Sequence, residues 1–218
     1  DAGLHSNLLL TQCFDPTTDE KMLYAAHRAY GERQEINREG SFVVTPREDR
    51  RLRIGYVSPD LYAHSVASFI EPVIKAHDRA RFCVICYSNL LRGDYVTARM
   101  KSAAEVWRDT TSSSDADLVN LIRADEIDIL VDLSGHTANN RLPVFARRAA
   151  PVQVSWIGYP ATTGLSRMDY RITDDWADPK GMSDQWHSEV LLRLDSCFLC
   201  YQAPSEAPDP GTDRVGPT

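Results

Sequence analysis

The sequence predicts an α/β fold in which a Rossmann-like, mostly parallel sheet is flanked by helices. Two observations support this prediction. From Leu52 onward, short apolar runs alternate with amphipathic stretches, as they do in repeated strand–helix–strand units. The chain is also long enough to bury a core without disulfides, because 43% of its 218 residues are hydrophobic and 25% are charged.

Six strands are expected in the main domain, each a short run of aliphatic or aromatic residues. They cover residues 52–57, 82–87, 106–108, 127–133, 152–157 and 170–173. Past Asp174 the pattern becomes less regular. Residues 189–194 and 197–201 are expected to form local strands or turns.

Helices are expected between these strands. One covers residues 65–77, where an apolar stripe recurs at helical spacing, and Pro72 inside it is expected to kink or break the helix. A second covers residues 94–105. A third is expected to begin at Asp115, a good N-cap residue, and a fourth near residues 141–143, where a proline suits the first turn.

The two ends of the chain differ from its middle. Near the N-terminus, a helix is expected from Asp19 until Gly31 stops it. We therefore divide the chain into a helical extension or linker (residues 1–49), a Rossmann-like lobe (50–201) and a tail rich in proline and glycine (202–218). The chain begins without a methionine and ends in linker-like sequence, so we expect it to be a piece of a longer protein.

Composition argues against several classes of partner. The formal charge is −7, from 31 acidic and 24 basic residues without a long run of one sign, so we expect neither nucleic acid nor a membrane surface as a partner. No apolar stretch approaches the ~20 residues of a membrane span. The five cysteines are an odd number, which favours a reducing compartment and predicts a cytoplasmic protein.

Two motifs could suggest a metal. Cys83 and Cys86 form one C-x-x-C pair and Cys197 and Cys200 another, but the first pair lies in a predicted strand, where positions i and i+3 point to opposite faces. We interpret the cysteines as small buried hydrophobes rather than zinc ligands. The D-x-D sequence at residues 115–117 has the form of a motif that holds a metal and a sugar nucleotide in one class of glycosyltransferase, but we favour its interpretation as a helix N-cap followed by an acid in the first turn.

Two histidines follow predicted strand ends, where open α/β sheets bind their ligands. They are His64 and His136, each in a loop with small or polar neighbours. Histidine is the natural proton acceptor near neutral pH, so both are candidate functional residues. The loop after the first strand contains no G-x-G-x-x-G sequence and the chain contains no Walker-type loop, which argues against a dinucleotide-binding site.

Three segments together resemble the SPINDLY and O-GlcNAc transferase family. They are IGYVSPD at residues 54–60 with His64 and Ser65, IDILVDLSGHTANNR at residues 127–141, and APVQVSWIGYP at residues 150–160 continuing to Tyr170. The resemblance extends from about residue 50 to Tyr201, in the same order and spacing. The wording of the middle loop and of residues 197–201 is closer to SPINDLY-like and bacterial members than to the animal enzymes.

The resemblance implies the N-terminal lobe of a GT-B glycosyltransferase. Such an enzyme is expected to be inverting and metal-independent, without a cofactor, and to transfer a sugar from a nucleotide donor to serine or threonine of intracellular proteins. UDP-GlcNAc is the first choice of donor and GDP-fucose the alternative. The expected partners are the nucleotide sugar, acceptor proteins, a preceding tetratricopeptide region and a C-terminal lobe that has no counterpart in these residues, so the chain alone is expected to be inactive.

Site residues follow from the same resemblance. His64 corresponds to the family's active-site histidine near the anomeric carbon and the acceptor hydroxyl. Gly135, His136 and Thr137 match the loop that faces the donor, and Ile157, Gly158 and Pro160 match the loop against the sugar and diphosphate. Asp128 stands where the animal enzymes have a histidine, and we assign it a structural role. The alternatives are a non-catalytic protein-binding lobe and a zinc-binding domain.

Overall fold

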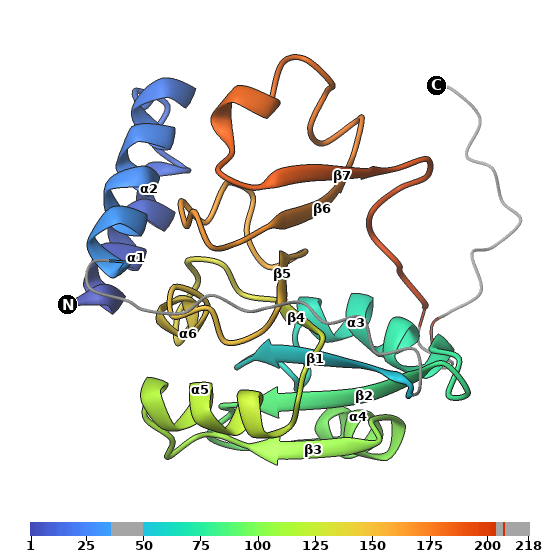
Figure 1. Ribbon diagram of the computed structural model, residues 1–218. Helices are drawn as coiled ribbons and strands as arrows, with labels where there is room; N and C mark the ends of the chain where they lie inside the picture. Colours follow the sequence, from blue (N-terminus) through green and yellow to red (C-terminus); the bar gives the residue numbers. More distant parts are fainter. Residues whose placement is uncertain (36–49, 204–206, 208–218) are drawn as a thin grey trace, which may run out of the picture.

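A seven-stranded parallel sheet forms the centre of the protein in the computed structural model, which describes residues 1–35, 50–203 and 207 (Figure 1). The strand order is β3-β2-β1-β4-β5-β6-β7, and every neighbouring pair is parallel. The strands are β1 (Leu52–Ser58), β2 (Phe82–Ser88), β3 (Val106–Asp109), β4 (Ile129–Asp132), β5 (Val152–Ser155), β6 (Tyr170–Asp174) and β7 (Val190–Leu194). The predicted α/β fold with a Rossmann-like parallel sheet is confirmed.

The order of the strands reverses between β1 and β4, which are adjacent in the sheet but separated by β2 and β3 in the sequence. In open α/β sheets this switch point lies beside the ligand site, at the carboxyl ends of the strands. All six expected strands are present, and residues 190–194 add a seventh at the edge. The expectation of a strand or turn over residues 197–201 is wrong, because Phe198 uses its backbone groups to bind the side chains of Asp174 and Trp156 instead.

Helices lie on both faces of the sheet and beside its upper half (Figure 1). They are α1 (Ala2–Gln12), α2 (Glu20–Glu35), α3 (Ser65–Ala76), α4 (Tyr95–Ala103), α5 (Asp115–Ala124), α6 (Leu142–Phe145) and the 3-10 turn η1 (Asp184–Trp186). Pro72 does not break α3. Because proline has no N–H, the carbonyl of Ser68 lacks its usual hydrogen bond within the helix. Both residues line an open cleft.

Two helix ends differ from the prediction. Ser114, not Asp115, caps α5, since its side chain accepts the N–H of Asp117. Gly31 does not stop α2. It lies inside the helix, and a Cβ atom there would stand 1.9 Å from the carbonyl oxygen of Gly164, so the absence of a side chain permits backbone contact between α2 and the lobe.

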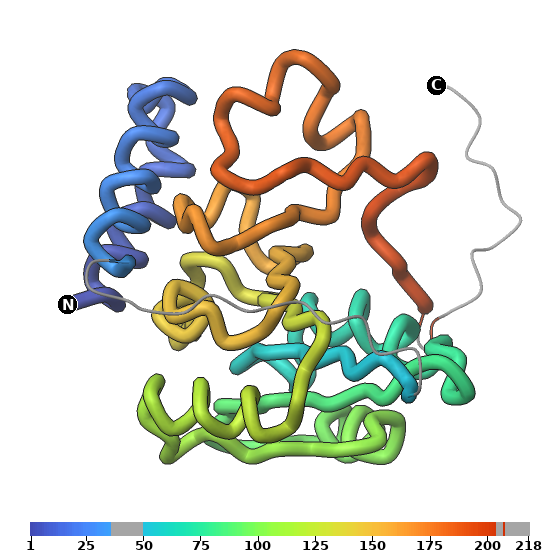
Figure 2. The backbone as a smooth tube through the Cα atoms, viewed as in Figure 1, coloured from blue at the N-terminus to red at the C-terminus, as the bar shows by residue number. Residues whose placement is uncertain are grey.

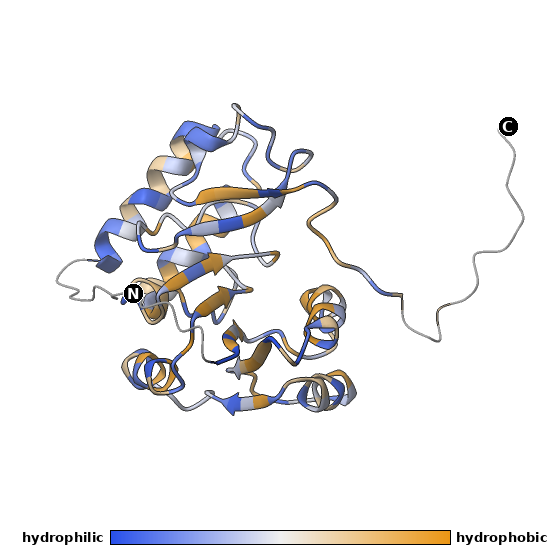
Figure 3. Ribbon diagram, turned by 45° about the vertical axis from the view of Figure 1, so that its right-hand side comes forward, coloured by the Kyte–Doolittle hydropathy of each residue, from blue (hydrophilic) through white to orange (hydrophobic). Residues whose placement is uncertain are grey.

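The core has two halves, one on each face of the sheet. Cys83 belongs to the half that α5, α6 and the N-terminal helices cover, whereas Cys86 belongs to the half under α3 and α4. This arrangement confirms that the first C-x-x-C pair points to opposite faces. Figure 3 shows the central strands as mainly hydrophobic and much of α2 as hydrophilic. In the residues that the structure describes, no helix has both the length and the apolar character needed to cross a membrane.

Candidate active site

The three loops that the sequence analysis identified lie at the carboxyl ends of the strands, on the same side of the sheet. They follow β1, β4 and β5, which are neighbouring parallel strands, so their carboxyl ends meet at the switch point. His64, the loop with Gly135 and the loop with Gly158 therefore share one end of the lobe.

His64 is the N-cap residue of α3. Its Nδ1 atom accepts the backbone N–H of Val66 at 3.3 Å, and its ring lies 5.5 Å from the ring of Tyr62. The side chain is half-exposed. With the Nδ1 lone pair engaged in the cap, the neutral ring carries its proton on Nε2, a tautomer that we assign from the hydrogen bond. In this state the imidazole can offer a hydrogen bond from Nε2.

A cleft of about 510 Å³ opens beside His64 between α3 and α4. Farther along it lies Glu71, which is nearly buried and binds Lys75 at 2.7 Å and Arg99 at 2.8 Å. In the loop before His64, burial raises the pKa of the Asp60 carboxyl. The cleft thus joins an imidazole and a short ion-pair network.

The side chain of Asp132, at the end of β4, binds the backbone of the loop that follows. This side chain is 1% exposed and accepts the N–H groups of Ser134 at 3.2 Å and Gly135 at 2.7 Å. Burial raises its pKa to about 7 against the effect of these two hydrogen bonds. Gly135 has a φ of +53°, and a Cβ atom there would stand 2.2 Å from Cβ of Tyr159. The turn therefore requires glycine.

His136 points inward from this turn. Its imidazole is fully buried, with Nδ1 3.0 Å from the Ser6 hydroxyl of α1 and Nε2 2.9 Å from the Thr163 carbonyl oxygen. Because a carbonyl only accepts, Nε2 donates to Thr163 and Nδ1 accepts from Ser6. Burial lowers the pKa of His136 to about 3. Its side chain is therefore a neutral structural group, and any role in a donor site would come from holding the loop.

The loop after β5 packs backbone to backbone on the loop after β4. Ile157 has a φ of +56°, and a Cβ atom on Gly158 would stand 1.9 Å from the carbonyl oxygen of Leu133. Pro160 is exposed and Ile157 and Gly158 are half-buried. The structure thus fixes the two predicted loops against each other, and only part of each reaches the surface.

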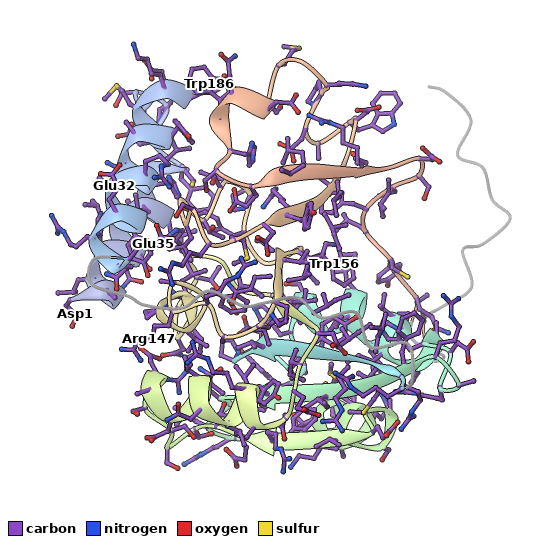
Figure 4. The ribbon with its side chains drawn as sticks, viewed as in Figure 1. Asp1, Glu32, Glu35, Arg147, Trp156 and Trp186 are labelled. Atoms are coloured by element: carbon purple, nitrogen blue, oxygen red, sulfur yellow. The ribbon has the colours of Figure 1, made fainter. Side chains whose placement is uncertain are left out.

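The N-terminal helices hold both loops through a second buried histidine. His27 of α2 donates from Nδ1 to the Leu23 carbonyl at 2.7 Å and accepts from the Tyr159 hydroxyl at 2.8 Å, and that hydroxyl lies 3.1 Å from Sγ of Cys13. Glu35, labelled in Figure 4, accepts the N–H of Arg167 at 3.0 Å. Sequence reasoning missed this contact set, because it joins residues more than a hundred positions apart.

Thr137 lines a different cavity from His64. This cavity, of about 560 Å³, lies between α1 and the loop after β4, and Asn7, Asn89 and Arg141 also line it. Arg141 binds Asp115 at 2.9 Å, while Asp117 accepts the Ser114 hydroxyl at 2.6 Å. Both carboxylates of the D-x-D sequence are thus engaged within the protein.

Within residues 1–35, 50–203 and 207, no three histidine, cysteine or acidic side chains are grouped so that they could hold one metal ion. Asp128 lies just before β4, at the amino ends of the strands, whereas His64 lies beyond their carboxyl ends. Its carboxylate binds Arg50 at 2.7 Å and accepts the N–H of Arg53 at 2.7 Å. These contacts agree with the structural role assigned to Asp128.

A strap formed by residues 195–203 leads from the end of β7 toward α3 (Figure 2), where the ring of Tyr201 lies 5.9 Å from that of Phe69. Phe198 anchors it: its N–H donates to Asp174 at 2.9 Å, and its carbonyl accepts Nε1–H of Trp156, labelled in Figure 4, at 3.1 Å. At its far end, Gln202 lines the cleft together with His64. Cys197 and Cys200 of the strap are exposed, so the interpretation of these two cysteines as buried hydrophobes is wrong.

The model of glycosyl transferase family 41 matches residues 34–202. The chain belongs to glycosyl transferase family 41. The resemblance to the SPINDLY and O-GlcNAc transferase family, on which the site residues were assigned, is thereby confirmed.

Several family 41 relatives are similar over nearly the whole chain. A probable UDP-N-acetylglucosamine–peptide N-acetylglucosaminyltransferase SPINDLY from Oryza sativa subsp. japonica is 43% identical over 98% of this chain and 23% of its own length. Its counterpart in Petunia hybrida is 44% identical over 93% of this chain and 22% of its own length. The chain therefore spans less than a quarter of the length of these relatives.

A solved structure supports the same assignment. A mutant of the Thermobaculum terrenum O-GlcNAc transferase superposes with a TM-score of 0.91 at 40% sequence identity, over 95% of this chain and 40% of that chain. The seven-stranded sheet is thus the fold of a family 41 catalytic lobe.

Proposed function

We propose that this chain is the first catalytic lobe of a protein O-glycosyltransferase. The whole enzyme would transfer a sugar from a nucleotide donor, UDP-GlcNAc as the first choice, to serine or threonine of acceptor proteins. The observation that carries the proposal is the position of His64: it caps α3 at the switch point and faces an open cleft, in a chain of glycosyl transferase family 41. The names of the plant relatives support the choice of donor.

In the proposed reaction, the acceptor hydroxyl oxygen attacks the anomeric carbon of the sugar. The bond between that carbon and the diphosphate oxygen breaks with its electron pair on the departing nucleoside diphosphate, and the hydroxyl proton passes to that diphosphate or to solvent, so one displacement inverts the anomeric centre. His64 would touch the reacting groups. In the tautomer that caps α3 its Nε2–H donates a hydrogen bond, which suits an oxygen that gains negative charge.

The loops after β4 and β5 would shape the donor side. Gly135 and Gly158 would bring backbone close to the donor, since their contacts with Tyr159 and Leu133 leave no room for a side chain at either position. Thr137, whose hydroxyl donates to the Ser134 carbonyl at 2.9 Å, lines the second cavity. Transfer without a metal or other cofactor remains part of this proposal. It is supported by the carboxylates of Asp115 and Asp117, which are engaged with Arg141 and Ser114.

The proposal includes a second lobe that completes the site, acceptor proteins, a preceding tetratricopeptide region and cytoplasmic action. The strap supports the second lobe, because it carries the chain from the edge strand β7 to the wall of the His64 cleft. A lobe that continues from this point would face the three loops. Without it, the chain is expected to bind the donor weakly and to transfer no sugar.

The decisive experiment uses His64 in the full-length enzyme. His64→Ala removes both the cap and the imidazole, whereas His64→Asn keeps a good N-cap oxygen and removes only the imidazole. We expect both variants to lose most sugar transfer while His64→Asn keeps the stability of the wild type. Normal transfer by a folded His64→Asn enzyme would remove His64 from the reaction.

The donor is read from the product. Mass spectrometry of a modified acceptor distinguishes an N-acetylhexosamine from a deoxyhexose, so the same assay decides between UDP-GlcNAc and GDP-fucose. Absence of any transfer by full-length protein with either donor would favour the non-catalytic protein-binding lobe.

A further inference from the structure

The five cysteines occupy three different environments. Cys83 and Cys86 are buried on opposite faces of β2. Cys13 is half-buried beside the Tyr159 hydroxyl. Cys197 and Cys200 are both exposed, on the strap, separated by two residues. Since thiol reactivity requires access, this pair is where thiol chemistry is to be expected.

The strap between and beyond these thiols is tied to the active-site end of the lobe. Phe198, which lies between the two cysteines, holds Asp174 through its N–H and Trp156 through its carbonyl. Directly after Cys200, the ring of Tyr201 lies 5.9 Å from that of Phe69 on α3. The next two residues line the cleft that contains His64. A change in the backbone at residues 197–200 would therefore reach the wall of that cleft only through Tyr201 and the two residues that follow it.

We propose that Cys197 and Cys200 form a reversible dithiol–disulfide site for low-molecular-mass disulfides, and that its oxidation rearranges the strap beside His64. The thiolate of one cysteine attacks a sulfur of the small disulfide, whose S–S bond breaks and releases one small thiol. The second cysteine then attacks the mixed disulfide and releases the other thiol. Two protein thiols are oxidised and one small disulfide is reduced to two thiols, with both protons carried away by the products.

Ring closure demands a tight turn. A disulfide requires the two Cα atoms to lie about 4.4–6.8 Å apart, whereas three extended peptide units span roughly 10 Å. The strap bends at Phe198 but has no hydrogen-bonded turn over residues 197–200. Tightening the bend into a turn is expected to rotate the peptide group between Cys197 and Phe198 and so to break the bond from the Phe198 N–H to Asp174.

Thiol chemistry of this kind stands independently of sugar transfer, and it can be measured on the chain itself. The chain is incubated with mixtures of oxidised and reduced glutathione, the remaining thiols are blocked with an alkylating reagent, and the products are identified by intact mass and peptide mapping. In the wild type we expect an internal bond between residues 197 and 200, with the loss of two hydrogen atoms. Cys197→Ser and Cys200→Ser should each stop at one mixed disulfide.

Cys13→Ser is the matched control, because it removes one thiol away from the strap and should leave the internal bond unchanged. A wild-type chain that accumulates two mixed disulfides, a bond between two chains, or no modification at all would overturn the proposal.

Coupling to the cleft has its own measurement. The N–H of Phe198 donates to a carboxylate, so loss of that bond should raise its amide hydrogen exchange by about tenfold on oxidation, with a change in the fluorescence of Trp156. Unchanged exchange at Phe198 in the fully oxidised chain would overturn the rearrangement of the strap. Neither result depends on whether the full-length enzyme transfers sugar.

Discussion

His136 offers the sharpest test of the lobe as described. Its imidazole is fully buried, and Ser6 and Thr163 occupy its two ring nitrogens. Burial lowers its pKa to about 3, from an ordinary value of 6.5. His136→Gln replaces it with a group that can also donate and accept but carries no charge at any pH. The substitution should therefore remove one source of acid sensitivity while preserving both hydrogen bonds.

The magnitude follows from linkage. Between pH 6.5 and pH 3 the unfolded chain binds a proton at this position and the folded chain does not, so the contribution of His136 to stability is complete above pH 6.5 and is lost as the pH falls. Each pH unit corresponds to about 1.4 kcal/mol. From pH 7.5 to pH 4.5, the free energy of unfolding of the wild type should fall by about 3 kcal/mol more than that of the variant.

The assay is urea denaturation of the chain at a series of pH values, followed by circular dichroism. Ser6→Ala is the matched control: it removes the hydroxyl that serves Nδ1 but leaves the imidazole buried, so it should lower stability and keep the wild-type pH dependence. If the wild-type and His136→Gln curves stay parallel across this range, the buried neutral imidazole and the inward turn at Gly135 are both refuted.

Four further predictions follow from other sites. Asp132→Asn should reduce the loss of stability at high pH. Burial raises the pKa of the folded Asp132 to about 7, so the free energy of unfolding of the wild type should fall by about 4 kcal/mol relative to that of the variant as the pH rises from 4 to 8. The same urea denaturation series measures this difference. Gly158→Ala should destabilise the chain by about 3 kcal/mol in urea, because the new methyl group would meet the Leu133 carbonyl; an unchanged midpoint would contradict the close contact of the two loops. Gly31→Ala should likewise separate α2 from the lobe. Amide hydrogen exchange should then become faster in α2 than in β4. His64→Ala should lower the stability of the chain by about 1 kcal/mol and His64→Asn by much less, and equal losses would argue against the helix-cap geometry.

The sheet was predictable because its signal is local. Residues 82–88 and 129–132 are runs of mainly apolar side chains, and such a run is typical of a buried strand. The alternation of such runs with helices then fixed the parallel arrangement. Cys83 and Cys86 followed from the same rule, since the period of a strand sends them to opposite faces.

What could not be predicted depends on contacts between distant segments. Helix α1 was not anticipated because its leucines do not form one stripe: Leu9 is buried, while Leu4 and Leu8 are exposed. Gly31 resembles a helix stop, yet the reason for a glycine there is the Gly164 carbonyl 133 positions away.

The two candidate histidines show the same difference between what local sequence and distant contacts determine. His64 lies in the loop between β1 and α3 and lines a cleft, as a residue in such a strand-to-helix loop is expected to. His136 occupies an equivalent position in sequence, but Gly135 turns the chain before it and the N-terminal helices supply a polar partner, Ser6, inside the protein. A linear pattern can place a residue in a loop, and only the packing decides toward which side it points.

The family match begins at residue 34, near the C-terminal end of α2, whereas Ser6 and His27 serve His136 and Tyr159 from residues before it. Removal of residues 1–33 would thus expose the buried side chains of His136 and Tyr159 to solvent. It would also remove one hydrogen-bond partner from each of them, Ser6 and His27 respectively. For this lobe, a unit that is cut, fused or transplanted should include α1 and α2.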